Sequence, residues 1–490
     1  MATHDPLFVH AAIILLGLII AGGALASLRD WRAGIWFWLL AGVLQDPVRK
    51  ILPGTPPILT LSFTPIYFAM FASLLAKTDA FGSFRRRFPE LMPIAALFCM
   101  TLVVSFAQTL SYGRSAYSVA VLGLFSYVGG VPAILLGFQY IRRSHVEVHR
   151  VLYVLMGITT VMLAGVFLEY MEVRLPVPAL GTIVQREWLR WVEGHEMRMI
   201  SGFYRTPEIM GWHAMTLVML GLYFMVRRPS LTLLWWSLMG LGGYAVLLSC
   251  RRKMFLALLV YVAALIIISR GAIRRRLAVY AAITAAMIVP VLLLVTERKY
   301  LLAAQTGLTT AGAKAAEKGF AGPMWLVNLV GPFGFGVGTK SQGTQHLDYM
   351  IQTPLVEGGF EKILVEVGVV GVTAACLLLA MLVIAAARCI RYTILRTGDN
   401  TLLVGIAALL CANLAMFVIS FQTYGDPFIV SLLGFLFGVL LSVSRVPSEP
   451  SSGAGREDAE TRRGKHRRRR TVEQPRRARR SIPPVEARTE

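Results

Sequence analysis

The chain has 490 residues, of which 56% are hydrophobic and only 16% are charged. A mean hydropathy of +0.62 excludes an ordinary soluble protein, because repeated apolar runs of about 20 residues match the thickness of a bilayer. The net charge of +22 does not indicate a nucleic-acid partner, since the basic residues gather in short loops and in a C-terminal tail. The sequence therefore predicts an all-α polytopic membrane protein.

Apolar runs that could cross a membrane follow one another through most of the chain, and we expect about 12–13 transmembrane helices. The second run is short, so a re-entrant segment is an alternative there. The first run lacks the cationic start of a secretory signal and is expected to be a retained helix. The runs lie near residues 8–28, 33–48, 57–76, 91–110, 117–140, 151–169, 208–226, 230–249, 254–269, 277–296, 363–387, 400–420 and 427–444.

The basic residues of the short loops predict the orientation, because lysine and arginine accumulate on the cytoplasmic side. Strict alternation of spans then places the N-terminus outside and the C-terminus inside. Two longer loops, about 170–207 and 297–362, fall on the outer side. Within the first of them, the aromatic and charged stretch 183–192 predicts a helix lying in the membrane interface. The basic loops contain Arg29/Arg32, Lys77/Arg85–Arg87, Arg142/Arg143/Arg150, Arg227/Arg228, Arg270/Arg274–Arg276 and Arg388/Arg391/Arg396.

The C-terminal tail, residues 446–490, differs in composition from the membrane part, residues 1–445. It is rich in Arg, Ser, Pro and Gly and has almost no apolar residues, so it is predicted to be disordered and cytoplasmic. Its arginine runs favour contact with anionic lipid headgroups over nucleic acid. No internal repeat indicates the inverted halves of a transporter.

Several cations fall on the predicted outer side, against the orientation bias. A membrane-edge cation needs a compensating anion, and the planar fork of arginine suits a diphosphate. We expect a site for a phosphorylated, membrane-embedded ligand, with Arg251 or Arg252 and Arg205 as first candidates. Contact with lipid phosphates, or a different topology, is the alternative. These outer cations are Arg49, Lys50, Arg205, Arg251, Arg252 and Lys253.

A glycine-rich segment with Gly334, Gly336 and Gly338 precedes Lys340 in the second outer loop. Glycines permit close backbone approach and positive φ, so the segment could present N–H groups to an anion. Packing of the loop against helices explains the glycines equally well. The spacing is neither that of a P-loop nor that of a dinucleotide fingerprint.

Four segments together resemble the O-antigen ligase and O-antigen polymerase family of bacterial inner-membrane glycosyltransferases. The resemblance covers about 200–385 and implies a mostly helical, metal-independent transferase of the GT-C type without a cofactor. Such an enzyme moves a glycan from an undecaprenyl diphosphate carrier to an acceptor on the outer face of the inner membrane. The segments are Gly202–Glu208 with Arg205, Ser249–Arg252, Gly334–Gly338, and Phe360–Gly371 with Glu366 and Gly368.

The resemblance also implies a catalytic base. Ligases of this family carry a loop histidine nine residues before the Glu-x-Gly motif, and that position here is Glu357. The departure favours a polymerase, with Glu357 as the base. His346 and Glu361 are the competing candidates. Glu361 could instead tune Glu357 or pair with a lysine, Lys362 or Lys340, and Glu366 could cap the following span.

The expected activity is therefore polymerisation of a surface polysaccharide, either O-antigen or exopolysaccharide. The expected partners are a lipid-linked oligosaccharide donor, a glycan acceptor and a chain-length regulator. Ligation to lipid A core or to protein is the close alternative. A flippase or other transporter is less favoured because the unusual cations gather at one face. A non-catalytic scaffold that recruits partners through its tail is a further alternative.

Overall fold

In the computed structural model the chain divides into two units, Met1–Val446 and Pro447–Glu490, and the description that follows concerns the first. The predicted tail 446–490 and most of the predicted span 277–296 lie outside the described residues. The described residues are 6–52, 56–114, 116–141, 146–172, 180, 188–192, 195–271, 274–283, 286, 305–306, 310–340, 354, 356–397 and 401–443.

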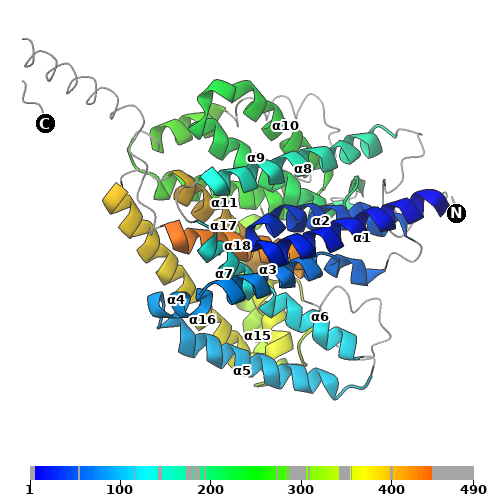
Figure 1. Ribbon diagram of the computed structural model, residues 1–490, viewed down its shortest axis with the longest axis vertical. Coiled ribbons are helices and arrows are strands. Elements are labelled where there is room, and N and C mark those ends of the chain that lie inside the picture. Colours follow the sequence, from blue (N-terminus) through cyan, green and yellow to red (C-terminus); the bar gives the residue numbers. More distant parts are fainter. Residues whose placement is uncertain are drawn as a thin grey trace, which may run out of the picture. The chain divides into compact units, whose positions relative to one another are not determined.

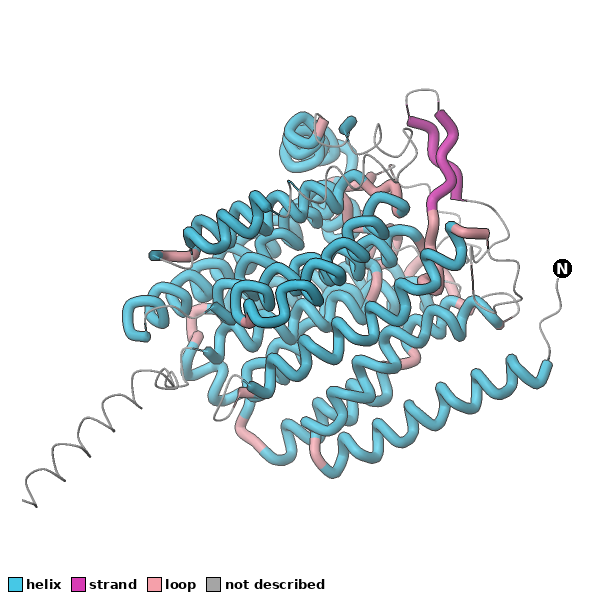
Figure 2. Tube along the Cα trace, turned by 90° about the horizontal axis from the view of Figure 1, so that it is seen from above, coloured by secondary structure: helices cyan, strands magenta, loops and turns pink. Residues whose placement is uncertain are grey.

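The first unit is built from helices that run side by side (Figures 1 and 2). Its N-terminal part contains α1 (Pro6–Arg29), α2 (Trp31–Ile51), η1 (Pro57–Leu61), α3 (Thr64–Lys77), α4 (Ala80–Arg87), α5 (Leu91–Leu110), α6 (Ala116–Val128), α7 (Gly130–Tyr140) and α8 (Val146–Tyr170). The remainder contains β1 (Trp188–Val192), β2 (His195–Met199), α9 (Pro207–Arg227), η2 (Pro229–Leu231), α10 (Thr232–Leu248), α11 (Arg252–Ile268), α14 (Ala311–Ala316), η3 (Glu317–Ala321), α15 (Gly322–Val330), α16 (Gly359–Thr397), α17 (Thr401–Ile419), η5 (Gln422–Gly425) and α18 (Pro427–Val443).

Nine helical segments among the described residues are long and apolar enough to cross a membrane, and α18 is a shorter apolar helix. The chain is therefore a helical, multi-pass membrane protein, as its composition predicts. The second apolar run forms α2, a continuous helix of 21 residues that begins at the N-cap Asp30. The helix continues beyond the apolar run and includes Arg49 and Lys50 in its last turn.

One sequence prediction is wrong. Residues 188–192 do not form an interfacial helix but the strand β1, which pairs antiparallel with β2 so that Val192 lies opposite His195. Only two residues, Glu193 and Gly194, separate the strands, which is the commonest length for a β-hairpin connection. Tryptophan and valine favour strands. The mixture of aromatic and charged residues in this stretch is compatible with an interfacial helix as well as with a strand, so composition alone could not decide between them. Figure 2 shows this hairpin in magenta; residues 183–187 lie outside the described residues.

Contacts sort the loops of the bundle into two ends. At the first, which we call the basic end, Lys77 Nζ donates to the Leu28 carbonyl at 3.0 Å and Arg388 pairs with Glu90 at 2.7 Å. At the other, which we call the site end, Lys50 Nζ donates to the Gly202 carbonyl at 2.5 Å. Each of these contacts joins residues that strict alternation of spans places on the same side.

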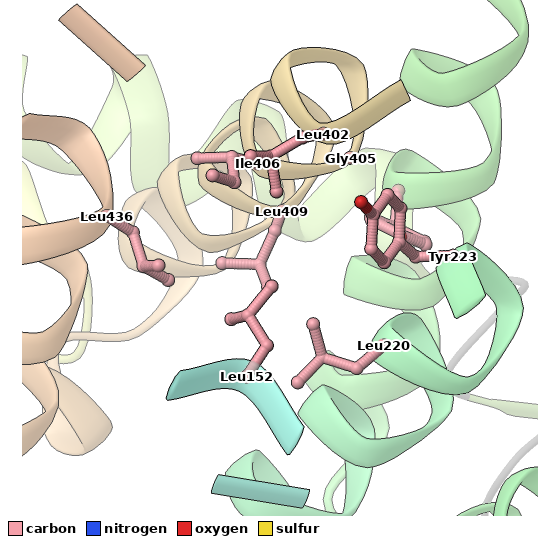
Figure 3. A pocket seen from close by; sticks show the side chains of 9 residues that line it. Leu152, Leu220, Tyr223, Leu402, Gly405, Ile406, Leu409 and Leu436 are labelled. Carbon is pink, nitrogen blue, oxygen red and sulfur yellow. The ribbon is translucent and has the colours of Figure 1, made fainter. Parts of the chain in front are cut away.

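The interior between α8, α9, α11, α17 and α18 is apolar and nearly filled. Figure 3 shows a small cavity there, lined by Leu152, Leu220, Leu409 and other apolar side chains with Tyr223. It measures ≈ 10 Å³, room for about one water molecule. A glycan or a diphosphate does not fit, so this cavity is not the place to look for a substrate site.

Helix α16 is broken near its start, and the glycine-rich segment fills the break. At Gly368 the backbone has φ 74° and ψ −173°, so the neighbouring helical hydrogen bonds are lost. The carbonyls of Val365 and Glu366 instead accept the N–H groups of Phe335 and Gly336, at 2.8 and 3.0 Å.

In exchange, the N–H groups that follow the break donate to the loop. Val369 N–H bonds the Gly331 carbonyl at 3.3 Å, and Val370 N–H bonds the Pro332 carbonyl at 3.2 Å. Backbone groups away from water must find partners within the protein. Here the glycine-rich segment supplies hydrogen-bond partners for the backbone groups on both sides of the break. The N–H groups of Phe335 and Gly336 are used in this packing, which supports packing rather than anion binding as their role.

The close approach explains the glycine at position 334. A Cβ added to Gly334 would lie 2.6 Å from the backbone nitrogen of Gly368, whereas one added to Gly331 would meet no atom within 4 Å. Both residues have positive φ, 76° and 72°. An alanine at either site therefore suffers backbone strain, and only at 334 does it also collide with α16.

We expect Gly334→Ala to destabilise the protein more than Gly331→Ala does. Backbone strain costs about 1–3 kcal/mol in each variant, and the collision adds to it at position 334 alone. The measurement is the unfolding midpoint of the purified protein in detergent. Equal unfolding midpoints for the two variants would contradict the close contact between Gly334 and the break in α16.

Candidate functional site

The short turn between α17 and α18, residues 420–426, contacts three segments that sequence analysis singles out. We call it the site turn. Lys253 Nζ donates to Ser420 Oγ at 2.8 Å and to Gln422 Oε1 at 3.4 Å. The N–H of Phe421 donates to the carbonyl of Glu357 at 3.0 Å. The third contact is an ion pair between Asp426 and Arg205.

Arg205 is held between two carboxylates, an arrangement that we call the clamp. Its Nη1 lies 3.2 Å from Asp46 Oδ1, its backbone N–H donates to Asp46 Oδ2 at 3.3 Å, and its Nη2 bonds Asp426. All three side chains are buried, and Arg205 is only 6% exposed. The clamp therefore ties α2, the entrance to α9 and the start of α18 together.

The electrostatics of Arg205 agree with this geometry. Burial lowers the pKa of its guanidinium, but the nearby carboxylates of Asp426 and Asp46 raise it, and the resulting pKa lies above the usual value of arginine. Arg205 is thus charged, and its charge is compensated within the protein. Arg205 was predicted to bind the diphosphate, but both of its terminal nitrogens are already bonded to carboxylates of the protein.

The segment before Arg205 is fixed from two sides. Glu169 Oε2, on α8, accepts the N–H groups of Ser201 and Gly202 at 3.2 and 2.6 Å. Lys50, at the end of α2, donates to Ser201 Oγ at 3.2 Å as well as to the Gly202 carbonyl. The Gly202–Glu208 stretch therefore serves as the junction between α2, α8 and α9.

The turn between α10 and α11 brings its three cations to the same end. Arg251 pairs with Glu208 on the first turn of α9, and its buried Nε has no hydrogen-bond partner in the described part of the chain. Arg252, the first residue of α11, is half-buried and forms no hydrogen bond or ion pair with described residues. Lys253 donates to the neutral side chains of Ser420 and Gln422 in the site turn.

Glu357 lies just before α16, with an exposed side chain. Its carboxylate forms no hydrogen bond or ion pair with the residues that the structure describes, while its carbonyl is bonded to the site turn. The buried Glu361 accepts the N–H groups of Glu357 and Gly358, at 3.0 and 2.8 Å. Its carboxylate lies 4.0 Å from Lys318 Nζ.

These contacts separate the roles of the two acids. Glu361 orders the backbone at the start of α16, a position where a carboxylate is favoured, and in this way it positions Glu357. Glu357 itself lies outside the helix, because α16 begins at Gly359. His346, the other candidate base, lies outside the described residues.

Glu366 is fully buried and accepts three hydrogen bonds, from Lys362 Nζ at 2.8 Å, Tyr127 Oη at 2.6 Å and the backbone N–H of Lys340 at 2.9 Å. It holds the glycine-rich segment against α6 and α16. Burial lowers the pKa of the Lys340 side chain, and Glu366 opposes the change only in part. Gly336 and Gly338 have positive φ like Gly334 and pack on α5 and α6.

Sequence analysis did not single out the acids of the clamp or the polar residues of the site turn. Asp426 is the one charged residue between the last two apolar runs, and an ionisable residue in such a place calls for a named partner. Asp46, next to the outer cations, gives the same signal. Ser420 and Gln422 have no such signal, because neutral polar residues are common at span ends.

Among the residues that the structure describes, no group of three or more His, Cys, Asp or Glu side chains is arranged to hold a metal ion. No protein-family model matches the chain, and a search of curated proteins finds no match. A function for this protein therefore rests on its own residues and on the motif resemblance described above.

Asp426→Asn tests the clamp. An asparagine can still accept the N–H groups of Phe428 and Ile429, which Asp426 caps at 2.7 and 3.1 Å. The substitution therefore removes mainly the ion pair with Arg205, which keeps Asp46 as its other partner. The cost should therefore lie below the roughly 3–5 kcal/mol of a buried charge left without any partner. We expect a clear fall in the unfolding midpoint of the purified protein.

The matched control is Asp79→Asn. Asp79 also caps a helix and pairs with an arginine, Arg86, at 2.7 Å, but both side chains are largely exposed. Exposed pairs contribute little, so its midpoint should stay near that of the wild type. A similar shift of the unfolding midpoint in both variants would show that the buried ion pair stabilises the protein no more than the exposed one does.

Proposed function

We propose that the protein is a glycosyltransferase of the bacterial inner membrane that polymerises a surface polysaccharide, O-antigen or exopolysaccharide. Its donor is a glycan linked to undecaprenyl diphosphate, and its acceptor is a sugar hydroxyl on the outer face of the membrane. The observation that carries the proposal is a cluster of buried and half-buried cations at the site end, joined through one turn to the backbone of Glu357, whose side chain is exposed.

The charge balance of this cluster supports an anionic ligand. Counted by formal charge, the six cations around Arg205 and Arg251 exceed the four carboxylates beside them, and charge at a membrane edge calls for compensation. A diphosphate diester matches that excess. The cations are Arg49, Lys50, Arg205, Arg251, Arg252 and Lys253, and the carboxylates are Asp46, Glu169, Glu208 and Asp426.

The contacts of each cation indicate which of them are able to bind the diphosphate. Arg205 is committed to the clamp, so we assign it a positioning role. Arg252, Lys253 and the Nε of Arg251 are the donors best able to bind the diphosphate, with Lys340 as a further candidate from the glycine-rich segment. Preorganised donors in a partly desolvated site stabilise the charge that develops on the leaving group.

The proposed reaction is a displacement at the anomeric carbon of the donor. The acceptor hydroxyl oxygen forms the new glycosidic bond, the bond from the anomeric carbon to the diphosphate oxygen breaks, and the lipid diphosphate leaves with the electron pair. Glu357 takes the hydroxyl proton. A positioned base contributes ~10²–10⁴-fold to the rate, and Glu361 and the site turn fix the backbone that carries Glu357.

The choice among related activities rests on the acceptor. Ligation to lipid A core or to protein would use the same donor and the same cations. Glu357 stands where the ligases that the sequence resembles carry a histidine, and this favours polymerisation. A flippase would need cations along its central path, whereas the cations named here lie at one end of the described bundle.

We expect Arg252→Ala, Lys253→Ala and Glu357→Gln each to abolish most long polymer while lipid-linked repeat units accumulate. Losing a transition-state donor costs about 10²–10³-fold in rate, and losing the base costs as much. The assay is gel analysis of surface polysaccharide and of extracted lipid-linked oligosaccharide, in cells that lack the chromosomal gene.

Arg388→Ala is the control, because Arg388 pairs with Glu90 at the basic end; its polymer should be normal. Protein abundance in the membrane is measured for each variant. Normal polymer from all three site variants, at normal abundance, would overturn the proposed function.

A further inference from the structure

We propose that the site turn binds the sugar attached to the donor diphosphate, and that Gln422 and Ser420 hydrogen-bond its hydroxyl groups. This inference rests on the proposed function and names a part of the substrate site that the sequence motifs do not include. It follows from the position of the turn and from the chemistry of its side chains.

The turn lies between the two groups that flank the reacting sugar. Lys253, a proposed ligand of the diphosphate, is bonded to Ser420 and Gln422. Glu357, the proposed base, is bonded to the next residue, Phe421. The sugar is attached to the diphosphate and is attacked by the hydroxyl that Glu357 deprotonates, so it must lie between these groups and alongside the turn.

The free hydrogen-bonding groups of the turn are neutral. Gln422 uses its Oε1 as an acceptor for Lys253, while its amide nitrogen forms no hydrogen bond with described residues. Ser420 Oγ accepts from Lys253, and its hydroxyl hydrogen has no acceptor in the described part of the chain. Amide and hydroxyl donors match the oxygen atoms of a sugar.

The turn also leaves room for a ligand. Gln422 and Tyr424 are half-buried, and a Cβ added to Gly425 would meet no atom within 4 Å. The hydroxyl of Tyr424 is already used, since it donates to the Asn413 carbonyl at 2.5 Å. Tyr424 therefore shapes the turn. The half-buried Gln422 is the more accessible donor for the sugar, and the buried Ser420, 6% exposed, lies beside it on Lys253.

The test compares two lipids that differ only in the sugar. Purified full-length protein in lipid nanodiscs is titrated with undecaprenyl diphosphate, and separately with the same lipid carrying the repeat unit of the native host. We expect the wild type to bind the glycan-bearing lipid more tightly. Gln422→Ala and Ser420→Ala should each weaken binding of that lipid by about three- to tenfold, the value of a neutral hydrogen bond. Binding of the bare lipid should change less, since there the two side chains act only through Lys253.

The controls separate this inference from the proposed function. Arg252→Ala should weaken both lipids, and Gln139→Ala, a glutamine bonded to Ser83 at the basic end, should weaken neither. If the turn variants weaken both lipids equally, or change neither, the turn does not bind the sugar. If the wild type fails to bind bare undecaprenyl diphosphate, the proposed function itself is overturned.

Discussion

The buried clamp of Arg205 between Asp46 and Asp426 is the interaction on which the site end depends. The three residues come from the end of α2, the entrance to α9 and the turn before α18, so the clamp brings together segments that no local pattern would join. Removing Arg205 would leave two buried carboxylates without their cation, and removing either aspartate would leave the guanidinium with a single carboxylate partner. Because Asp426 ends the site turn, the clamp also sets the position of the residues that contact Lys253 and Glu357.

A second constraint comes from the broken helix α16. A gap in a helix at membrane depth is tolerated only where other groups satisfy the backbone, and the glycine-rich segment does so on both sides of Gly368. Glu366 then ties this segment to α6 through Tyr127. The short helical stretch before the break carries Glu361 and leads directly to Glu357. The glycine-rich segment, for which the sequence left both anion binding and packing open, is thus part of the scaffold that presents Glu357.

The helical membrane fold could be predicted from the sequence, because the length of an apolar run indicates a membrane span and the basic loops indicate which span ends lie together. The sequence also identified Arg205 as unusual, but the two aspartates that pair with Arg205 lie 159 and 221 residues away along the chain, and only the packing of helices brings them together. Residues 188–192 show another limit, since tryptophan and arginine suit both an interfacial helix and a strand. The site turn could not be predicted from the sequence, because its proposed role depends on contacts with Lys253 and Glu357, which belong to distant segments.

The central claim is that the cations of the site end face the compartment where the lipid-linked glycan is presented. The most direct measurement is cysteine labelling with a membrane-impermeant reagent on intact cells, in a variant without the native cysteines. A cysteine at Gly425, where the structure leaves open space, should react from outside, and one at the exposed Arg85 of α4 should react only after the membrane is permeabilised. The opposite result would place Arg252, Lys253 and Glu357 in the cytoplasm and contradict the proposed transferase.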